Sequence, residues 1–338
     1  MVTLEQVRAG NGRIATELPP GLVGVFAGAT SGVGELALKG FAKHAARPKI
    51  YFIGRSQEAG ARLLVELKEL NAEGEYNFIK ADVSLMKNVD QVCREIKEKE
   101  KVINVLLLSQ GTLNMSGDTS EGLRYLMAVN YYSRMRMALN LLPLMEAAKS
   151  LRRIVSIQSA GFEGTLHLDH LGDGKIPLRD SRPHLASLNT LALEALARRS
   201  PTVSYIHNYP GFVESNLIRP EDGMIMQVLG VWFKLTSRRK WVPPLDVQER
   251  HAWLCASGLY PDKQASDGNG AVVTTELKVV KGSDGTQGSG VYSIDDFGDD
   301  TSDRSVEPLR KHRENGAVDA IWKDLEDHFT RITGAVSV

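Results

Sequence analysis

Cysteine is scarce in this sequence, because the 338 residues contain only Cys93 and Cys255, far apart along the chain. Two such cysteines exclude a disulfide framework and offer no spacing typical of a zinc site. Residues 1–20 are polar and contain no apolar segment of the kind that a secretory signal requires. This cysteine usage favours a reducing compartment, so the sequence predicts a cytoplasmic protein.

The sequence also lacks net charge and long apolar runs. Forty-one basic and forty-one acidic residues cancel, so no overall field attracts the chain to nucleic acid or to an anionic membrane. No run approaches the ~18 apolar residues that a membrane-spanning helix requires. We therefore expect neither a nucleic-acid partner nor a transmembrane segment.

The most informative stretch joins an apolar run, residues 22–27, to a cluster of glycines that precedes a helical pattern. The cluster consists of Gly28, Ala29, Thr30, Ser31, Gly32, Val33 and Gly34. Glycines here permit a tight turn, let a pyrophosphate approach the backbone and allow close packing of helix on strand. The N–H groups at the start of a helix attract phosphate. The stretch predicts a dinucleotide cradle, and the alternative is an ordinary turn between strand and helix.

Strand-like and helix-like segments alternate at least six times along the chain. Strands are expected at 22–27, 50–53, 76–81, 102–108, 153–159 and 203–207. Helices are expected at 33–44, 58–70, 84–99, 120–149 and 184–198. This alternation is typical of a parallel sheet with right-handed crossovers. We therefore predict an α/β fold, a Rossmann-type doubly wound parallel sheet with helices on both faces, whose ligands bind at the carboxyl ends of the strands.

Several finer features complete this organisation. Thr3 and Gln6 form a capping box for a short N-terminal helix, and Ser84 is expected to cap the helix that follows the third strand. Pro143 is expected to kink or divide the long helix. No composition break marks a linker before residue 220, which favours a single domain over residues 1–338.

The part of the chain beyond residue 220 has a different character. The apolar residues 224–235 are interpreted as a helix packed on the core, and the alternatives are a lid over an apolar substrate or a docking surface. A helix that starts at Pro244, a last strand at 290–294 and an amphipathic helix at 317–332 are expected. Residues 261–338 would then form an extension packed on a core at 20–260.

With these elements placed, the chain resembles the short-chain dehydrogenase/reductase family over about residues 20–260. Residues 27–34 are similar to that family's Thr-Gly-x-x-x-Gly-x-Gly loop, with Ala27 in place of the threonine. Asn130 stands where the family has the helix asparagine that organises a proton-relay water. The loops and the long C-terminal portion resemble reductase-type members of fungal secondary-metabolite pathways. Beyond the glycine loop, the resemblance implies cofactor contacts at Asp82, Val83, Ser109, Gly111, Pro210, Gly211 and Val213.

Cofactor choice depends on the residues that follow the second strand. An acidic side chain there would bind the ribose 2′-hydroxyl of NAD. Arg55 and Ser56 occupy that place, and a guanidinium beside a hydroxyl suits a 2′-phosphate through charge-assisted bonds. The residues favour NADP(H), and the alternative is a solvated arginine in a loop.

The catalytic half of the family pattern is altered. The resemblance implies a serine that holds the substrate oxygen, a tyrosine that donates the proton and a lysine four residues after the tyrosine. Ser159 stands at the serine position, but His184 and Leu188 stand at the tyrosine and lysine positions. The candidate catalytic residues are therefore Ser159, His184 and Asn130. His184 either supplies the proton, since imidazole titrates near neutral pH, or is a partly exposed residue at a helix N-terminus.

Three functional hypotheses follow. The first is an NADP(H)-dependent oxidoreductase with an atypical site, acting on a small apolar ketone, enone or iminium in secondary-metabolite biosynthesis. The second is a non-redox isomerase or cyclase that uses the fold as a pocket, and the third is an inactive scaffold. The resemblance also implies a homo-oligomer, a dimer or a tetramer, and the alternative is that the C-terminal extension blocks either interface. His207 either lines the cleft or is a satisfied core residue, and the polar loop with His167 and His170 is interpreted as solvated, so no metal site is expected.

Overall fold

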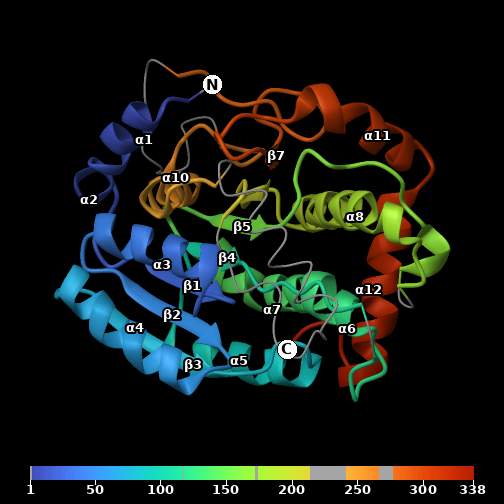
Figure 1. The fold of residues 1–338 in the computed structure, drawn as a ribbon, viewed down its shortest axis with the longest axis horizontal. Coiled ribbons are helices and arrows are strands. Elements are labelled where there is room, and N and C mark those ends of the chain that lie inside the picture. Colours follow the sequence, from blue (N-terminus) through green and yellow to red (C-terminus); the bar gives the residue numbers. More distant parts are fainter. Residues whose placement is uncertain (1, 116, 172–173, 214–240, 266–276) are drawn as a thin grey trace.

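The computed structural model describes residues 2–115, 117–171, 174–213, 241–265 and 277–338. They build a seven-stranded parallel sheet in the order β3-β2-β1-β4-β5-β6-β7 (Figure 1). The strands are β1 (Val23–Ala27), β2 (Lys49–Gly54), β3 (Glu75–Lys80), β4 (Val105–Leu108), β5 (Arg153–Ile157), β6 (Ser204–Asn208) and β7 (Val291–Ile294). The order reverses between β1 and β4, so the predicted doubly wound α/β fold is confirmed.

Helices cover both faces of this sheet. One face carries α3 (Gly32–His44), α4 (Gln57–Leu70) and α10 (Pro244–Ala256). The other carries α5 (Met86–Lys99), α7 (Ser133–Glu146), α8 (Leu178–Arg199) and α12 (Ala317–Thr333). The other α-helices among the described residues are α1 (Leu4–Asn11), α2 (Ile14–Glu17), α6 (Tyr125–Met127) and α11 (Ser302–Glu314). Thr3 and Gln6 form the predicted capping box on α1.

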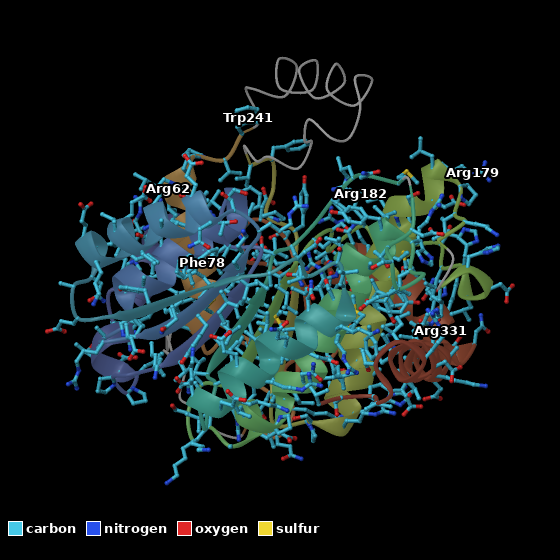
Figure 2. All side chains as sticks on the ribbon, turned by 90° about the horizontal axis from the view of Figure 1, so that it is seen from below. Arg62, Phe78, Arg179, Arg182, Trp241 and Arg331 are labelled. Carbon is cyan, nitrogen blue, oxygen red and sulfur yellow. The ribbon has the colours of Figure 1, made fainter. Side chains whose placement is uncertain are left out.

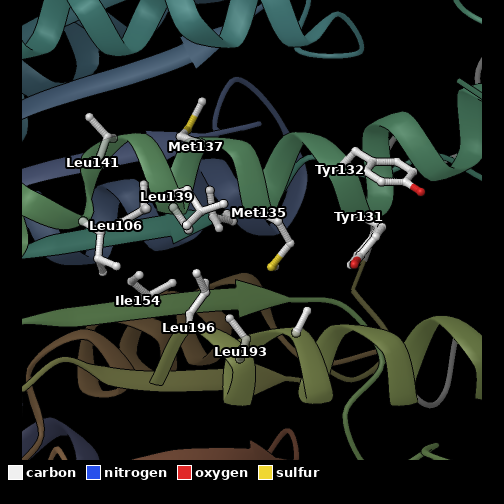
Figure 3. Close-up of a cluster of buried hydrophobic side chains, with 14 of the residues drawn as sticks. Leu106, Tyr131, Tyr132, Met135, Met137, Leu139, Leu141, Ile154, Leu193 and Leu196 are labelled. Atoms are coloured by element: carbon white, nitrogen blue, oxygen red, sulfur yellow. The ribbon is translucent and has the colours of Figure 1, made fainter. Parts of the chain in front are cut away.

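The core lies in two layers, one on each side of the sheet. In β4, Leu106 and Leu108 pack on the α7 and α8 side, whereas Val105 and Leu107 pack on the α3 side. Figure 3 shows part of the first layer, in which Met135 of α7 and Leu193 and Leu196 of α8 point toward the strands, whereas Met137 and Leu141 point away from them. Because helices cover both faces of β4, all of its side chains are apolar, which explains the continuous apolar run in the sequence.

The prediction of a long helix at 120–149 is wrong at the N-terminal end of that helix. Helix α6 begins at Tyr125, and a π-helical turn, Ala128–Tyr132, separates it from α7. The segment before α6 forms a turn in which Asp118 and Arg124 pair across an antiparallel bridge. Backbone pairing within that turn competes with helix formation, which the apolar pattern alone does not reveal.

Ser84 is not the N-cap of α5, contrary to the prediction. The cap residue is Leu85, and the Glu121 carboxylate accepts the main-chain N–H groups of Met86 at 2.6 Å and Lys87 at 3.0 Å. A carboxylate from a distant loop therefore satisfies the first turn of α5. No local sequence pattern encodes such a cap.

Helix α8 begins six residues earlier than the predicted start at 184. Residues 178–183 comprise Leu178, four polar residues and Pro183, so the apolar periodicity becomes regular only after them. His184 is consequently inside the helix and not at its N-terminus. Its side chain is fully buried, so the interpretation as a partly exposed helix-terminal residue is wrong.

The C-terminal segment joins the same architecture. β7 pairs with β6 in parallel, and the apolar face of α12 packs against α8 and α5. The buried Arg136 of α7 donates to the Asp90 carboxylate through Nε and Nη2, and its Nη1 donates to the carbonyls of Ala335 and Val336. The predicted strand at 290–294 and helix at 317–332 are confirmed, whereas residues 224–235 lie outside the described residues.

No helix in the described ranges combines the length and the apolar character that crossing a bilayer requires.

Candidate cofactor and active site

The glycine cluster forms a tight connection between β1, β4 and α3. Gly28 has φ +72°, and its N–H donates to the Ile53 carbonyl at 3.0 Å. A Cβ at Gly28 would lie 2.6 Å from Gln110 Cα, and a Cβ at Gly34 would lie 2.8 Å from Ser109 Oγ. Side chains larger than hydrogen therefore cannot enter without displacing the backbone. Gly28, Gly34 and Ser109, three of the predicted cofactor residues, thus lie together at the edge of the sheet, and their contact with a cofactor stays a prediction.

The first turn of α3 presents uncapped N–H groups. Ser31 is the N-cap residue, but its side chain makes no capping bond within the described part of the chain. Ser56, in contrast, caps α4 by accepting the N–H of Ala59 at 3.1 Å. The N–H groups of Gly32 and Val33 at the start of α3 are therefore left for an external acceptor, and an anion is the acceptor that such a helix end favours.

Arg55 and the end of β3 border a hollow of about 330 Å³. Arg55 is exposed and donates to the Tyr125 hydroxyl at 3.4 Å. Asp82 lines the same hollow and accepts the Ser84 N–H at 3.0 Å, while Val83 is buried behind it. Arg55 and Asp82, two of the predicted cofactor residues, therefore line one hollow, and their contact with a cofactor stays a prediction.

Arg134 of α7 organises the loop that follows β4. Its guanidinium donates to the carbonyls of Leu108 at 2.8 Å and Gln110 at 2.5 Å, and to Ser156 Oγ at 2.8 Å. The turn at Ser109, Gln110 and Gly111 is therefore held by a side chain of α7, a helix that covers one face of the sheet. Sequence reasoning missed Arg134, although an arginine inside an otherwise apolar helical pattern was a usable signal.

Asn130 lies in the π-helical turn and is almost fully buried. Its side-chain amide pairs with both main-chain groups of Thr112, accepting the N–H at 3.0 Å and donating to the carbonyl at 2.8 Å. Its own carbonyl accepts the amides of Gln158 at 3.3 Å and Asn189 at 3.5 Å. Asn130 therefore ties the loop after β4 to the end of β5 and to α8.

Ser159 follows β5 and is 8% exposed. Its main-chain N–H donates to His207 Nε2 at 3.2 Å, and His207 Nδ1 lies 2.8 Å from Thr190 Oγ1. Glu163 Oε1 accepts the hydroxyls of Thr190 at 2.8 Å and Ser293 at 2.7 Å. Because Nε2 accepts a bond, a proton is assigned to Nδ1 of His207. His207 is thus not positioned as a base for a serine hydroxyl, which argues against a nucleophilic serine.

Glu163 is the charged end of this network, and both partners of its pair with His207 are fully buried. Burial opposes the charged form, but hydrogen bonds from His207 and Ser293 outweigh it and hold the pKa of the Glu163 carboxyl below its usual value. No local sequence pattern indicates Glu163, because its partners come from α8, β6 and β7.

His184 faces a group of other histidines. Its Nδ1 accepts the His167 N–H at 3.2 Å, so its proton is assigned to Nε2, a buried atom without a partner in the described ranges. Burial, followed by the charges of His167, His170 and His312, lowers the pKa of His184 to about 4. The expectation that this ring titrates near neutral pH is therefore wrong, and its catalytic role stays a prediction. Leu188 is a buried core residue.

The predicted nicotinamide-side stretch begins directly after β6. Gly211 has φ +77°, and a Cβ there would lie 2.8 Å from Asp296 Oδ2. Beside it, the Arg182 guanidinium stacks 3.3 Å above the Phe162 ring, and Phe162 meets Tyr209 edge to face. Figure 2 shows Arg182 near the start of α8, well away from Arg62 on α4.

The structure therefore assembles the predicted residues in separate groups. The glycine cluster meets Ser109 at the cradle, and Arg55 meets Asp82 at the hollow, whereas Pro210 and Val213 belong to the stretch after β6. Among the contacts of the described residues, none joins Ser159 directly to His184. No group of three or more metal-binding side chains occurs in the described ranges.

Comparisons with known proteins agree with this geometry. The sequence pattern of the short chain dehydrogenase family matches residues 23–169. Oxidoreductase AN1596 of Emericella nidulans is 34% identical over 96% of this chain and 97% of its own length. Oxidoreductase andH of Emericella variicolor is 31% identical over 99% of each chain. Among solved structures, the 3-oxoacyl (acyl-carrier-protein) reductase of Agrobacterium tumefaciens C58 with NADP bound has a TM-score of 0.51 at 17% identity, over 71% of this chain and 89% of that one.

Proposed function

The chain belongs to the short-chain dehydrogenase family, and from this premise we propose that it is an NADP(H)-dependent oxidoreductase of a small apolar metabolite. Relatives that match nearly the whole chain carry the name oxidoreductase. The single observation that carries the proposal is the glycine cradle at the end of β1, where Gly28 and Gly34 leave no room for a side chain.

The residues around the cradle fit a phosphorylated dinucleotide. The uncapped N–H groups of α3 suit the pyrophosphate. Arg55 stands at the end of β2 next to the Ser56 cap of α4, where a guanidinium and a helix N-terminus together favour a 2′-phosphate. Asp82 and Val83 border the hollow that the adenine end would enter.

We assign the chemistry to Ser159 and His184, with hydride exchange supplied by the nicotinamide of the bound cofactor. Ser159 holds the substrate oxygen, and its main chain is fixed by His207. His184 offers a neutral Nε2–H as a hydrogen-bond donor, because its pKa of about 4 leaves no imidazolium near neutral pH. A neutral imidazole polarises a carbonyl without transferring a full positive charge to it.

The surroundings of Ser159 support the proposed substrate class. Phe162 and Tyr209 form an aromatic contact after β5 and β6, and Pro210 follows directly. These side chains favour an apolar ketone, enone or iminium. We place the reaction in secondary-metabolite biosynthesis, which the resemblance to fungal reductases supports.

Titration with NADPH, followed by the fluorescence of the reduced nicotinamide, tests the cofactor assignment. The Arg55→Ala variant should bind NADPH at least tenfold more weakly and NADH equally well, because only NADPH carries the 2′-phosphate. Arg62→Ala is the matched control, since Arg62 lies on α4 but pairs with Glu35 and Glu66. Absence of NADPH binding to the wild-type protein at millimolar cofactor would overturn the proposal.

Mass spectrometry of metabolites from cells with and without the gene tests the reaction class. A change of two hydrogens in the accumulating compound is expected for a reductase. An isomer of unchanged mass would instead support an isomerase or a cyclase, and the same metabolites in both cells would support a scaffold.

A further inference from the structure

Arg134 of α7 is a buried cation without an anionic partner among the described residues. It is 1% exposed, and the acceptors of its hydrogen bonds are neutral: the carbonyls of Leu108 and Gln110 and the hydroxyl of Ser156. Its Nε has no hydrogen-bond partner in the described ranges. A fully buried charge normally has an ionic partner, because its desolvation is costly. The described part of the chain therefore leaves this charge unbalanced.

Two other buried arginines are arranged differently. Arg136, also on α7, donates to the Asp90 carboxylate through Nε and Nη2. Arg153 donates to carbonyls, as Arg134 does, but it is the first residue of β5 and so lies at the amino edge of the sheet. Arg134 instead binds groups at the carboxyl ends of β4 and β5, the edge at which ligands of such sheets bind.

The contacts of Arg134 place its charge directly behind the glycine cradle. Its Nη2 donates to the Gln110 carbonyl at 2.5 Å, and a Cβ at Gly28 would lie 2.6 Å from the Cα of the same Gln110. The neighbouring Ser109 borders Gly34, since a Cβ there would lie 2.8 Å from Ser109 Oγ. Burial lowers the pKa of the Arg134 guanidinium to about 9, so the group stays charged near neutral pH. Gln110 therefore contacts the guanidinium on one side and the turn at Gly28 on the other.

We propose that Arg134 determines cofactor affinity through its charge, which balances the pyrophosphate of a dinucleotide bound in the cradle. The inference rests on the proposed NADP(H) binding. A pyrophosphate carries two negative charges, and salt screens a buried cation much less than an exposed one. The N–H groups at the start of α3 supply the direct hydrogen bonds, and Arg134 adds charge from behind the loop without contacting the ligand.

Dissociation constants measure this contribution. At an effective dielectric constant of about 20, unit charges about 10 Å apart change a binding constant by more than about tenfold. Loss of the Arg134 charge should therefore weaken NADPH, NADP⁺ and 2′-phospho-ADP-ribose about tenfold each, because all three carry the pyrophosphate. Adenosine 2′-monophosphate carries the adenine and the 2′-phosphate without the pyrophosphate, so its affinity should change by less than about twofold.

Ser156 allows the charge to be neutralised while the arginine stays in place. Its hydroxyl lies 2.8 Å from Arg134 Nη1, so the carboxylate of Ser156→Asp should pair with the guanidinium as Asp90 pairs with Arg136. Ser156→Asp should bind the three pyrophosphate ligands about tenfold more weakly than the wild type does. Ser156→Asn is the matched control, since its side chain has the same size and no charge, and it should bind them as the wild type does.

Variants of Arg134 itself supply a second comparison. Arg134→Met removes the charge and should weaken the same ligands about tenfold, whereas Arg134→Lys keeps the charge and should stay within about threefold of the wild-type affinity. Arg153→Met is the control for the loss of a buried arginine, because its carbonyl partners lie away from the cradle. Near-UV circular dichroism checks that each variant is folded.

The outcomes distinguish this inference from the proposed function. If the wild-type protein binds neither NADPH nor NADP⁺, the proposed function fails and the inference falls with it. If the wild type binds both and Ser156→Asp binds them as tightly as Ser156→Asn, the cofactor assignment stands and the role of Arg134 is wrong. Equal losses for adenosine 2′-monophosphate and for the pyrophosphate ligands would show that the substitutions disturb the whole site, which also overturns the inference.

Discussion

Two regions meet at the carboxyl edge of the sheet, and they are built by opposite means. The cradle between β1, β4 and α3 uses backbone and small residues, such as Gly28 and Gly34, to leave space. The region after β5, β6 and β7 uses buried ionisable side chains, Glu163, His184 and His207. At the cradle, a side-chain atom added to a glycine would clash with its neighbours. In the second region, the stability of the buried polar network depends on the protonation states of its groups.

The largest expected effect concerns the cradle. Gly28→Ala should lower the free energy of unfolding by about 4 kcal/mol, because the left-handed backbone and the crowding against Gln110 both add a cost. Urea denaturation measures the change. Gly21→Ala is the control, since Gly21 has φ +81° but open space around it, and it should cost only about 1 kcal/mol. Equal costs for the two variants would show that the cradle is not tightly packed.

The next effect concerns proton binding in the second region. His184 has a pKa of about 4 in the folded protein and 6.5 as a free side chain, so the unfolded chain binds more protons between these values. Stability from the neutral ring is therefore complete above pH 6.5 and falls as the pH drops to 4, by about 3 kcal/mol. In His184→Gln this loss should disappear from urea denaturation measured between pH 7 and 4.

His251 provides the comparison for that experiment. It is also buried, its pKa is lowered to about 4 by burial, and it lies in α10 on the other face of the sheet. His251→Gln should remove a similar acid-dependent loss, and the double variant should remove both because the sites are distant. A pH profile of His184→Gln that matches the wild-type profile would contradict the buried, neutral state of His184.

A smaller effect is expected at the charged end of the network. Glu163→Gln keeps the shape but removes the carboxylate that accepts the Thr190 and Ser293 hydroxyls, and should cost about 2 kcal/mol near neutral pH. The pKa of Glu163 is lowered on folding, so this contribution is present above pH 4.5 and lost as the pH falls through the folded value. Exposed Glu314→Gln should change stability by less than about 0.5 kcal/mol.

The smallest effect compares two serines at helix starts within the first region. Ser56→Ala removes the cap of α4 and should cost about 1 kcal/mol in thermal or urea unfolding. Ser31→Ala should cost almost nothing without cofactor, because Ser31 makes no capping bond to α3 in the described part of the chain. A cost at Ser31 equal to that at Ser56 would mean that the first turn of α3 is not left open for a ligand.

The tight turn of the first region was predictable from the sequence, whereas the hydrogen-bond network of the second region was not. The cradle is encoded by glycines within seven consecutive residues, and its strand and helix are neighbours along the chain. The network around Ser159 joins residues from β5, α8, β6 and β7, and no local pattern announces such pairing. Tertiary contacts also replaced the expected cap at Ser84 by the distant Glu121. The burial that lowers the pKa of His184 could not be inferred either, because Pro183 and the polar residues before it concealed the true start of α8.

The contacts of Arg136 carry a consequence for how the protein is made. Its guanidinium binds carbonyls at Ala335 and Val336, which lie 199 and 200 residues later in the chain. During synthesis α7 leaves the ribosome long before these residues exist, so its buried face stays incomplete while most of the sheet is already translated. A nascent chain stalled before residue 330 should therefore remain accessible to chaperones and proteases. The buried face of α7 can be completed only after α12 has been translated.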